Sequence, residues 1–141
     1  MKFIFTTILA MAIIGTSCTA TFTAAERETI GSGDEIMHLT TIDNEADSLF
    51  LRQVSKSLSR RDVASEEFST LCRRMLSTVR NPENEGVGIA APQVGILRRV
   101  VAVQRFDKEG EPFEFYINPK FVEYGEDWEL GGEGCLSVPD F

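Results

Sequence analysis

The chain has 141 residues, 43% of them hydrophobic and 26% charged, which is the composition of one soluble globular domain. Its 22 acidic and 14 basic side chains give a formal net charge of -8, so no positive field is available to recruit phosphates, and nucleic acids and anionic membrane surfaces are excluded as partners. We expect the isolated arginine pairs to be solvated surface; they are Arg60–Arg61, Arg73–Arg74 and Arg98–Arg99.

The N-terminus has the pattern of an export signal. Lys2 precedes an apolar run over residues 3–14, and small residues then lead to Cys18. The run is shorter than the roughly 20 residues of a membrane span, but it suits a signal peptide within residues 1–25. Two processing sites stay open: lipidation of Cys18 with cleavage just before it, or ordinary cleavage near residues 24 and 25. A buried N-terminal helix is the third interpretation.

Either processing route takes the protein out of the cytoplasm. We therefore expect an exported bacterial protein, which is either periplasmic or a membrane-anchored lipoprotein. Its contact with a membrane would be limited to the signal peptide or the lipid anchor.

The next segment, residues 26–46, is polar and lacks a hydrophobic period. Two glycines near its start favour a polar arm or tether over a packed element. We expect the globular domain to occupy residues 47–141, which is enough chain for a small core.

A helix is predicted from Ser65 onward. Ser65 is a favourable N-cap, and the sequence NPENEG at residues 81–86 ends the helix. Apolar side chains at i, i+3 and i+4 spacing share one face of it; they are Phe68, Leu71, Cys72, Met75, Leu76 and Val79. This stripe predicts that Cys72 is a plain buried thiol, with a disulfide to Cys135 as a lesser alternative for an exported chain.

Strands are predicted after the helix. Residues 97–106 form a β-branched run typical of a buried strand, residues 107–112 form a turn, and residues 113–124 supply two further strand segments that are interrupted at Asn118–Pro119. Because no strand alternates with a helix, the order indicates an α+β fold.

The sequence GVGIAAPQVG, residues 86–95, predicts a tight glycine loop. Two glycines spaced by one residue let the backbone approach a ligand closely, and Pro92 fixes the direction of Gln93, whose amide can donate a hydrogen bond to a developing oxyanion. A dinucleotide fingerprint is excluded, because the loop follows a helix and lacks the third spaced glycine. A purely structural loop is the alternative.

The sequence EGCLSVP, residues 133–139, carries the second candidate site. A thiolate at Cys135 can reach a metal from between small neighbours, and the backbone N–H of Leu136 can point into the same site. A free cysteine in a loop is the alternative interpretation.

Taken together, the two segments resemble the peptide deformylases, metal-dependent amidases that remove the formyl group from N-terminal formylmethionine. The family's motif Gly-φ-Gly-φ-Ala-Ala-x-Gln is matched at every position by GVGIAAPQ, and its motif Glu-Gly-Cys-Leu-Ser is matched in full by EGCLS. The similarity spans residues 47–141 and includes the sequences LRQVSKSL, LRRVVAV and YINPKF. It implies a peptide-deformylase-like fold, with a helix followed by antiparallel strands.

The resemblance also implies roles for individual residues. Cys135 would be a ligand of the catalytic divalent metal, which is usually Fe²⁺ and replaceable by Ni²⁺, Co²⁺ or Zn²⁺. Gln93 and the backbone N–H of Leu136 would stabilise the oxyanion, and the backbone of Gly88 would contact the substrate. The partner would be an N-formyl-Met peptide, while the oligomeric state is not indicated.

One family motif is absent from the 141 residues. The helical motif His-Glu-x-x-His supplies two imidazole ligands and a catalytic glutamate, whereas the one histidine of this chain, His38, lies in the polar segment with no glutamate beside it. We therefore expect a truncated or degenerate member that lacks the C-terminal metal-binding helix, does not bind metal stably and is inactive as this chain. Two alternatives are a non-catalytic exported homologue with a residual peptide-binding groove, and an unstable gene fragment.

Overall fold

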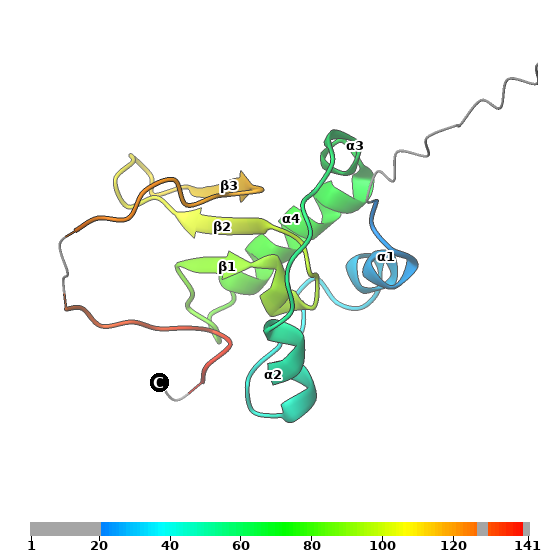
Figure 1. Ribbon diagram of the computed structural model, residues 1–141, viewed down its shortest axis with the longest axis horizontal. Helices are drawn as coiled ribbons and strands as arrows, with labels where there is room; N and C mark the ends of the chain where they lie inside the picture. The colour runs from blue at the N-terminus through cyan, green and yellow to red at the C-terminus, as the bar shows by residue number, and fades with distance from the viewer. Residues whose placement is uncertain (1–20, 127–129, 140–141) are drawn as a thin grey trace, which may run out of the picture.

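The computed structural model describes residues 21–126 and 130–139. A three-stranded antiparallel sheet, in the order β1-β2-β3, packs against helix α4 through β1, and the shorter helices α1 and α3 also contact α4 (Figure 1). The elements are α1 (Ala24–Gly31), α2 (Glu45–Leu51), α3 (Arg60–Val63), α4 (Glu66–Val79), β1 (Gly88–Ala90), the 3-10 helix η1 (Ala91–Val94), β2 (Val100–Gln104) and β3 (Phe113–Ile117). This order confirms the α+β expectation.

Helix α4 is the predicted helix. The Ser65 hydroxyl accepts a hydrogen bond from the backbone N–H of Phe68 at 3.2 Å, which satisfies a free donor of the first turn. The apolar stripe faces the sheet and α1, with Leu71 and Met75 fully buried. Cys72 is half-buried against this core, and burial raises the pKa of its thiol to about 11. The prediction of an inert thiol at this position is consistent with that environment.

The sheet is built around β2. Its residues Val100 and Ala102 are fully buried, as expected for the predicted strand. β2 pairs with β3 in the register Ala102↔Phe115 and with β1 in the register Ala102↔Ile89. The predicted turn at residues 107–112 joins β2 to β3.

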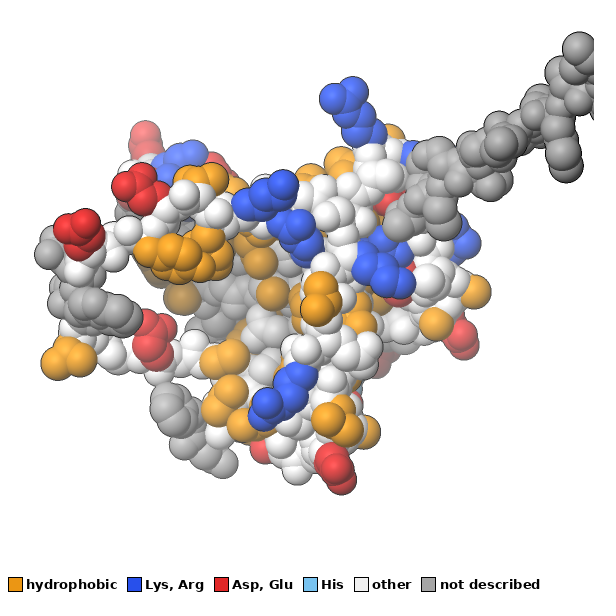
Figure 2. Space-filling model, viewed as in Figure 1, with side chains coloured by type: hydrophobic (Ala, Val, Ile, Leu, Met, Phe, Trp, Pro, Cys, Tyr) orange, Lys and Arg blue, Asp and Glu red, His pale blue; other side chains and the backbone are white. Residues whose placement is uncertain are grey.

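The second strand segment that we predicted after Asn118 is wrong. Asn118 adopts a left-handed φ of 53°, and its side chain accepts from the N–H of Leu58 at 2.8 Å and donates to the Leu58 carbonyl at 2.9 Å. These bonds turn the backbone out of the sheet, so residues 119–126 run as an irregular segment with no strand partner in the described part of the chain. Hydrophobic side chains in and just after this segment are strongly exposed; they are Phe121, Val122, Tyr124 and Leu130. Figure 2 shows exposed hydrophobic side chains on the face in view.

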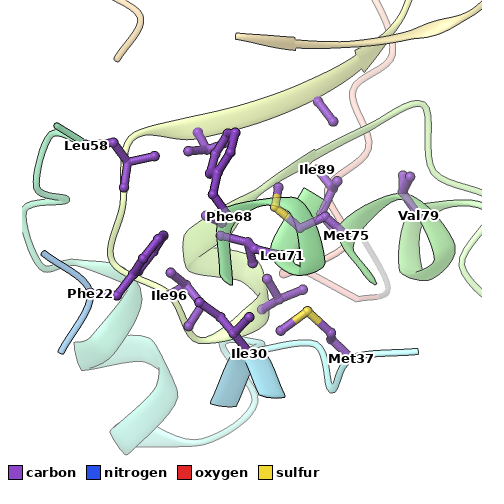
Figure 3. Packing of buried hydrophobic residues seen from close by; sticks show 14 residues of the cluster. Phe22, Ile30, Met37, Leu58, Phe68, Leu71, Met75, Val79, Ile89 and Ile96 are labelled. Carbon is purple, nitrogen blue, oxygen red and sulfur yellow. The ribbon is translucent and has the colours of Figure 1, made fainter. Parts of the chain in front are cut away.

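The segment at residues 26–46 is not a tether. It begins in α1, whose N-terminus carries a reciprocal capping box between Thr23 and Glu26, and it continues through Met37, whose N–H donates to the Thr78 hydroxyl of α4 at 2.8 Å. Ile30 and Met37 are buried, and Figure 3 shows them in one cluster with side chains of α4. The segment contributes isolated apolar anchors instead of a periodic face, which explains why its pattern suggested an arm.

Two of the arginines that we expected at the surface are buried. Arg98 is 1% exposed; its guanidinium donates to both carboxylate oxygens of Glu26 at 2.7 Å and to the Thr21 carbonyl at 2.7 Å. It also lies over the Phe22 ring, 5.2 Å from the centroid. Arg74 is 6% exposed and donates to carbonyls at the end of α1. A carboxylate and a carbonyl offset the cost of burying Arg98, and carbonyl acceptors offset part of the cost of burying Arg74.

No helix within residues 21–126 and 130–139 is long and apolar enough to cross a membrane.

Replacing Glu26 by Gln tests the buried ion pair. We expect the substitution to lower the free energy of unfolding by about 2 kcal/mol at neutral pH, because the Arg98 guanidinium stays buried without its counter-charge. Burial opposes ionisation of Glu26, yet hydrogen bonds from Arg98 and Thr23 hold the pKa of the carboxyl below its ordinary 4.5. This contribution is therefore complete above the unfolded-state pKa and is lost as pH falls through the folded-state pKa.

Thermal melts across pH measure the effect. The difference in melting temperature between the parent chain and Glu26→Gln should be full well above pH 4.5, the ordinary pKa of a glutamate, and should narrow as the pH falls through the lower folded-state pKa of Glu26. Glu28→Gln, which is exposed on the same helix, is the matched control and should leave the melts unchanged. If the difference in melting temperature between the parent chain and Glu26→Gln persisted in acid, it would contradict the ion-pair assignment.

Candidate functional site

A groove of about 770 Å³ lies between three segments of the chain. Residues 39–43 form one border, residues 83–88 form the second and residues 134–139 form the third, with Gln93 between them. The groove therefore combines the N-terminal part of the chain, the loop after α4 and the cysteine-containing segment.

The position of Gln93 follows from the local backbone. Pro92 lies in the first turn of η1, and Gly95 ends this 3-10 helix with a left-handed φ of 80°. The side-chain oxygen of Gln93 accepts from the N–H of Ala90 at 2.8 Å, and its backbone carbonyl accepts from the N–H of Thr40 at 2.8 Å. Because the oxygen of the amide is engaged, its NH₂ group is the end that remains for a ligand.

The cysteine-containing segment is held by backbone and packing contacts. The N–H of Ile42 donates to the Ser137 carbonyl at 2.9 Å, and the N–H of Val138 donates to the Cys135 carbonyl at 2.9 Å in a tight turn. Leu136 packs over Gly86 so closely that a Cβ at that glycine would lie 3.0 Å from Leu136 Cδ1. This close approach requires glycine and explains the first Gly of the GVG sequence.

The structure brings the predicted site residues together. Gln93 Nε2 lies 3.8 Å from the Sγ of Cys135, although the two residues are 42 positions apart. Gly88 and Leu136 line the same groove. Cys135 is exposed and Gln93 is half-buried, so the pair is accessible from solvent. The roles of these residues stay predictions, and Cys18 lies outside the described residues.

The donor set in the groove does not fit a held metal ion. Within the part of the chain that the structure describes, no three His, Cys, Asp or Glu side chains gather as a metal site. His38 lines a different cavity from the one that contains Cys135. One thiolate is short of the three protein ligands of a typical catalytic metal centre, so no chemical step is assigned to a metal on these residues. Cys72 and Cys135 are both free thiols, and the disulfide alternative is wrong.

One border of the groove, at residues 39–43, was not predicted from the sequence. Leu39, Thr41 and Asp43 line it but belong to the segment that we interpreted as an arm. The sequence Thr-x-x-Glu at residues 23–26 was the available signal, because a capping box marks the start of a helix. A helix at that position would have indicated that the domain begins before residue 47.

Gly86→Ala tests the packing that seats the cysteine-containing segment. The new Cβ would lie 2.8 Å from Cγ2 of Val79, a fully buried residue of α4, as well as close to Leu136. Because Val79 is fully packed in the core, the backbone at residue 86 must shift away from it and displace Leu136, and we expect a loss of about 1–3 kcal/mol in the free energy of unfolding. Thermal melts and the rate of thiol labelling at Cys135 measure the effect, and labelling should become faster.

Gly125→Ala is the control for this substitution, because a Cβ there meets nothing within 4 Å. Equal melts and equal labelling rates for the two variants would show that the Gly86 contact does not position the segment.

The chain is similar in sequence to known peptide deformylases. The sequence model of a family described as "Polypeptide deformylase" matches residues 36–141. A peptide deformylase of Leptospira biflexa is 34% identical over 96 residues, covering 63% of this chain and 52% of the relative. Peptide deformylase 2 of Vibrio cholerae is 44% identical over 91 residues, covering 64% and 50%. The chain thus spans about half the length of the curated relatives it matches.

Solved structures show the same similarity. A class I type b peptide deformylase from Acinetobacter baumannii with Met-Ala-Ser bound matches with a TM-score of 0.62 and 30% identity, over 74% of this chain and 67% of that one. The actinonin-bound form of that enzyme matches with a TM-score of 0.61 and 30% identity, over 74% and 64%. A peptide deformylase from Synechococcus elongatus in complex with actinonin matches with a TM-score of 0.60 and 32% identity, over 77% and 54%.

Proposed function

Because the chain belongs to the polypeptide deformylase family, we propose that its groove binds the N-formyl-Met end of a peptide and that the whole protein is an amidase acting on the formyl group. The observation that carries this proposal is the 3.8 Å approach of Gln93 Nε2 to Cys135 Sγ inside an open groove. Peptide and actinonin complexes of similar structures support the same class of ligand.

The groove offers two hydrogen-bond donors to the carbonyl oxygen of the formyl group. The NH₂ group of Gln93 is oriented by the bond between its side-chain oxygen and the N–H of Ala90. The N–H of Leu136 has no acceptor among residues 21–126 and 130–139. Preorganised donors of this kind stabilise the negative charge that develops on a carbonyl oxygen during attack.

The backbone of β1 offers a place for the rest of the peptide. β1 pairs with β2 on one side and has no strand partner on the other within the described residues. Gly88 lines the groove and has no side chain, so a ligand can approach its backbone closely. An extended peptide can therefore hydrogen-bond along this edge, as peptides commonly do at an open sheet edge.

The proposal assigns binding and orientation to these residues, and no hydrolytic step. In this family a divalent metal activates water for attack, but among residues 21–126 and 130–139 Cys135 is the one ligand of the expected kind that lines the groove. We accordingly expect no turnover of a formyl-Met peptide by the 141 residues with added Fe²⁺ or Ni²⁺. A non-catalytic exported homologue would use the same groove for binding alone.

Gln93→Glu tests the donor role. A glutamate keeps an oxygen to accept from the Ala90 N–H, yet it replaces the NH₂ donor by a carboxylate oxygen that repels a carbonyl. We expect the parent chain to bind formyl-Met-Ala-Ser saturably and the variant to bind it at least about tenfold more weakly, the effect of losing one hydrogen bond and gaining a repulsion. Isothermal titration measures both affinities.

Two controls accompany this titration. Gln53→Glu, which is exposed and outside the groove, introduces the same charge and should leave the affinity unchanged. A cooperative thermal transition of the parent chain should precede any binding measurement, since its absence would favour the unstable-fragment alternative. Lack of saturable binding by a folded parent chain would overturn the proposed function.

We also propose that the protein is exported and processed at Cys18, on the N-terminal side of the folded domain. Cleavage near residues 24 and 25 would remove Phe22, which is 3% exposed, and Thr23, which caps α1. It would also remove the Thr21 carbonyl that accepts from Arg98. Lipidation at Cys18 keeps all three groups, and for that reason we favour it over ordinary signal cleavage.

The mass of the mature protein tests the processing site. Expressed with its full N-terminus in a bacterium, the chain should be recovered from the membrane fraction beginning at Cys18 and carrying a lipid. Cys18→Ser should move the protein out of the lipid-modified fraction without changing its thermal melt. A mature chain that begins at Ala25 or Glu26 would contradict this assignment.

A further inference from the structure

We infer that the protein binds a short aliphatic carboxylate in a second cavity, separate from the groove, and that Arg74 holds the charged end of this ligand. The second cavity and the groove have no lining residue in common. The inference therefore does not depend on the proposed function, and either can fail without the other.

The second cavity lies where the chain after α1 meets α4 and η1. Its volume is about 410 Å³, which is within the range of sites that hold small molecules. Residues between positions 29 and 40 supply most of its lining, Arg74 enters it from α4, and Val94 and Gly95 border it at the end of η1.

Arg74 is a buried cation that has neutral partners. Its side chain is 6% exposed, and no ion pair among the described residues includes it. Nη1 donates to the carbonyls of Thr29 and Ile30 at 2.9 and 2.7 Å, and Nη2 donates to the Asp34 carbonyl. Because carbonyl oxygens carry no net charge, the charge of the guanidinium is solvated by dipoles and has no counter-charge.

The guanidinium of Arg74 also has a donor that is not used. Nε is buried and has no hydrogen-bond partner in the part of the chain that the structure describes, and a buried donor without an acceptor costs free energy. Nε and Nη2 form one edge of the guanidinium, and such an edge can donate two parallel hydrogen bonds to a carboxylate. A carboxylate bound there would supply both the missing acceptor and the missing counter-charge.

Two carboxylates of the protein itself lie near Arg74, and neither pairs with it. Glu35 lies in the field of Arg74, but its two oxygens accept from Arg73 and from the Ser77 hydroxyl. Asp34 borders the cavity and takes part in no ion pair among the described residues. Its negative charge favours a ligand with one negative charge over a doubly charged phosphate.

The apolar part of the lining suits a short hydrocarbon chain. Met37 and Val94 are buried and line the cavity, and Ile36, which is 40% exposed, lines it as well. Apolar ligand atoms that leave water against these side chains contribute to binding in proportion to the area buried. A cation edge next to an apolar wall matches a carboxylate with a short alkyl chain, such as butyrate.

His38 provides a reporter inside this cavity. It is the one histidine of the chain and it lines the cavity, so the NMR signals of its ring protons report on this site alone. We expect sodium butyrate, added to the full chain at constant pH and constant ionic strength, to shift these signals saturably with a Kd of about 1–10 mM. Sodium phosphate should bind at least about fivefold more weakly. No saturable shift with butyrate, or the same shift with sodium chloride, would overturn the inference.

Two variants test the assignment of the ligand's two ends. Arg74→Lys keeps a cation but loses the planar fork of donors, and it should weaken butyrate binding at least about tenfold. Because Arg74 also bonds the end of α1, a second variant leaves it in place. Ile36→Glu replaces an apolar lining residue by a carboxylate that repels the ligand, and it should weaken binding at least about fivefold.

Ile42→Glu is the matched control for the second variant. Ile42 is 49% exposed on the same segment and lies outside the cavity, so this substitution changes the net charge equally and should leave the affinity for butyrate unchanged. Equal affinities of Ile36→Glu and Ile42→Glu for butyrate, or an unchanged affinity of a folded Arg74→Lys variant, would show that the ligand does not lie in this cavity.

Discussion

The buried guanidinium of Arg98 is the constraint on which the arrangement of this chain depends. A charge that is 1% exposed must find a counter-charge and acceptors inside the protein. The partners that it finds, Glu26 and the Thr21 carbonyl, lie more than seventy positions earlier in the sequence. Folding the strand region around Arg98 therefore requires the N-terminal segment to be folded against it.

The groove is a consequence of this requirement. Once α1 is fixed by Glu26 and by the carbonyls that accept from Arg74, the chain that follows it must cross α4. The N–H of Thr40 then meets the Gln93 carbonyl, and the N–H of Ile42 meets the Ser137 carbonyl. One extended segment thus links η1 to the cysteine-containing segment and supplies a border of the groove itself.

The elements that short-range sequence patterns determine were predictable from the sequence. The helix α4 combines a cap with a periodic stripe, and β2 is a β-branched run, so both were predictable. The approach of Gln93 to Cys135 was predictable only through the two motifs, because no rule of spacing joins residues 42 positions apart. The buried roles of Arg98 and the turn at Asn118 depend on partners distant in sequence, and an arginine beside another arginine carries no local sign of burial. For the same reason the anchoring residues of the 26–46 segment were not recognised.

The orientation of the Gln93 amide links the local structure to recognition. Its oxygen is engaged by the Ala90 N–H, so rotation of the amide by half a turn would break that bond and place two NH groups against each other. The donor end is therefore held toward Cys135, whatever occupies the groove. A carboxylate ligand end, a carbonyl and a thiolate can all accept from it, but a cation cannot.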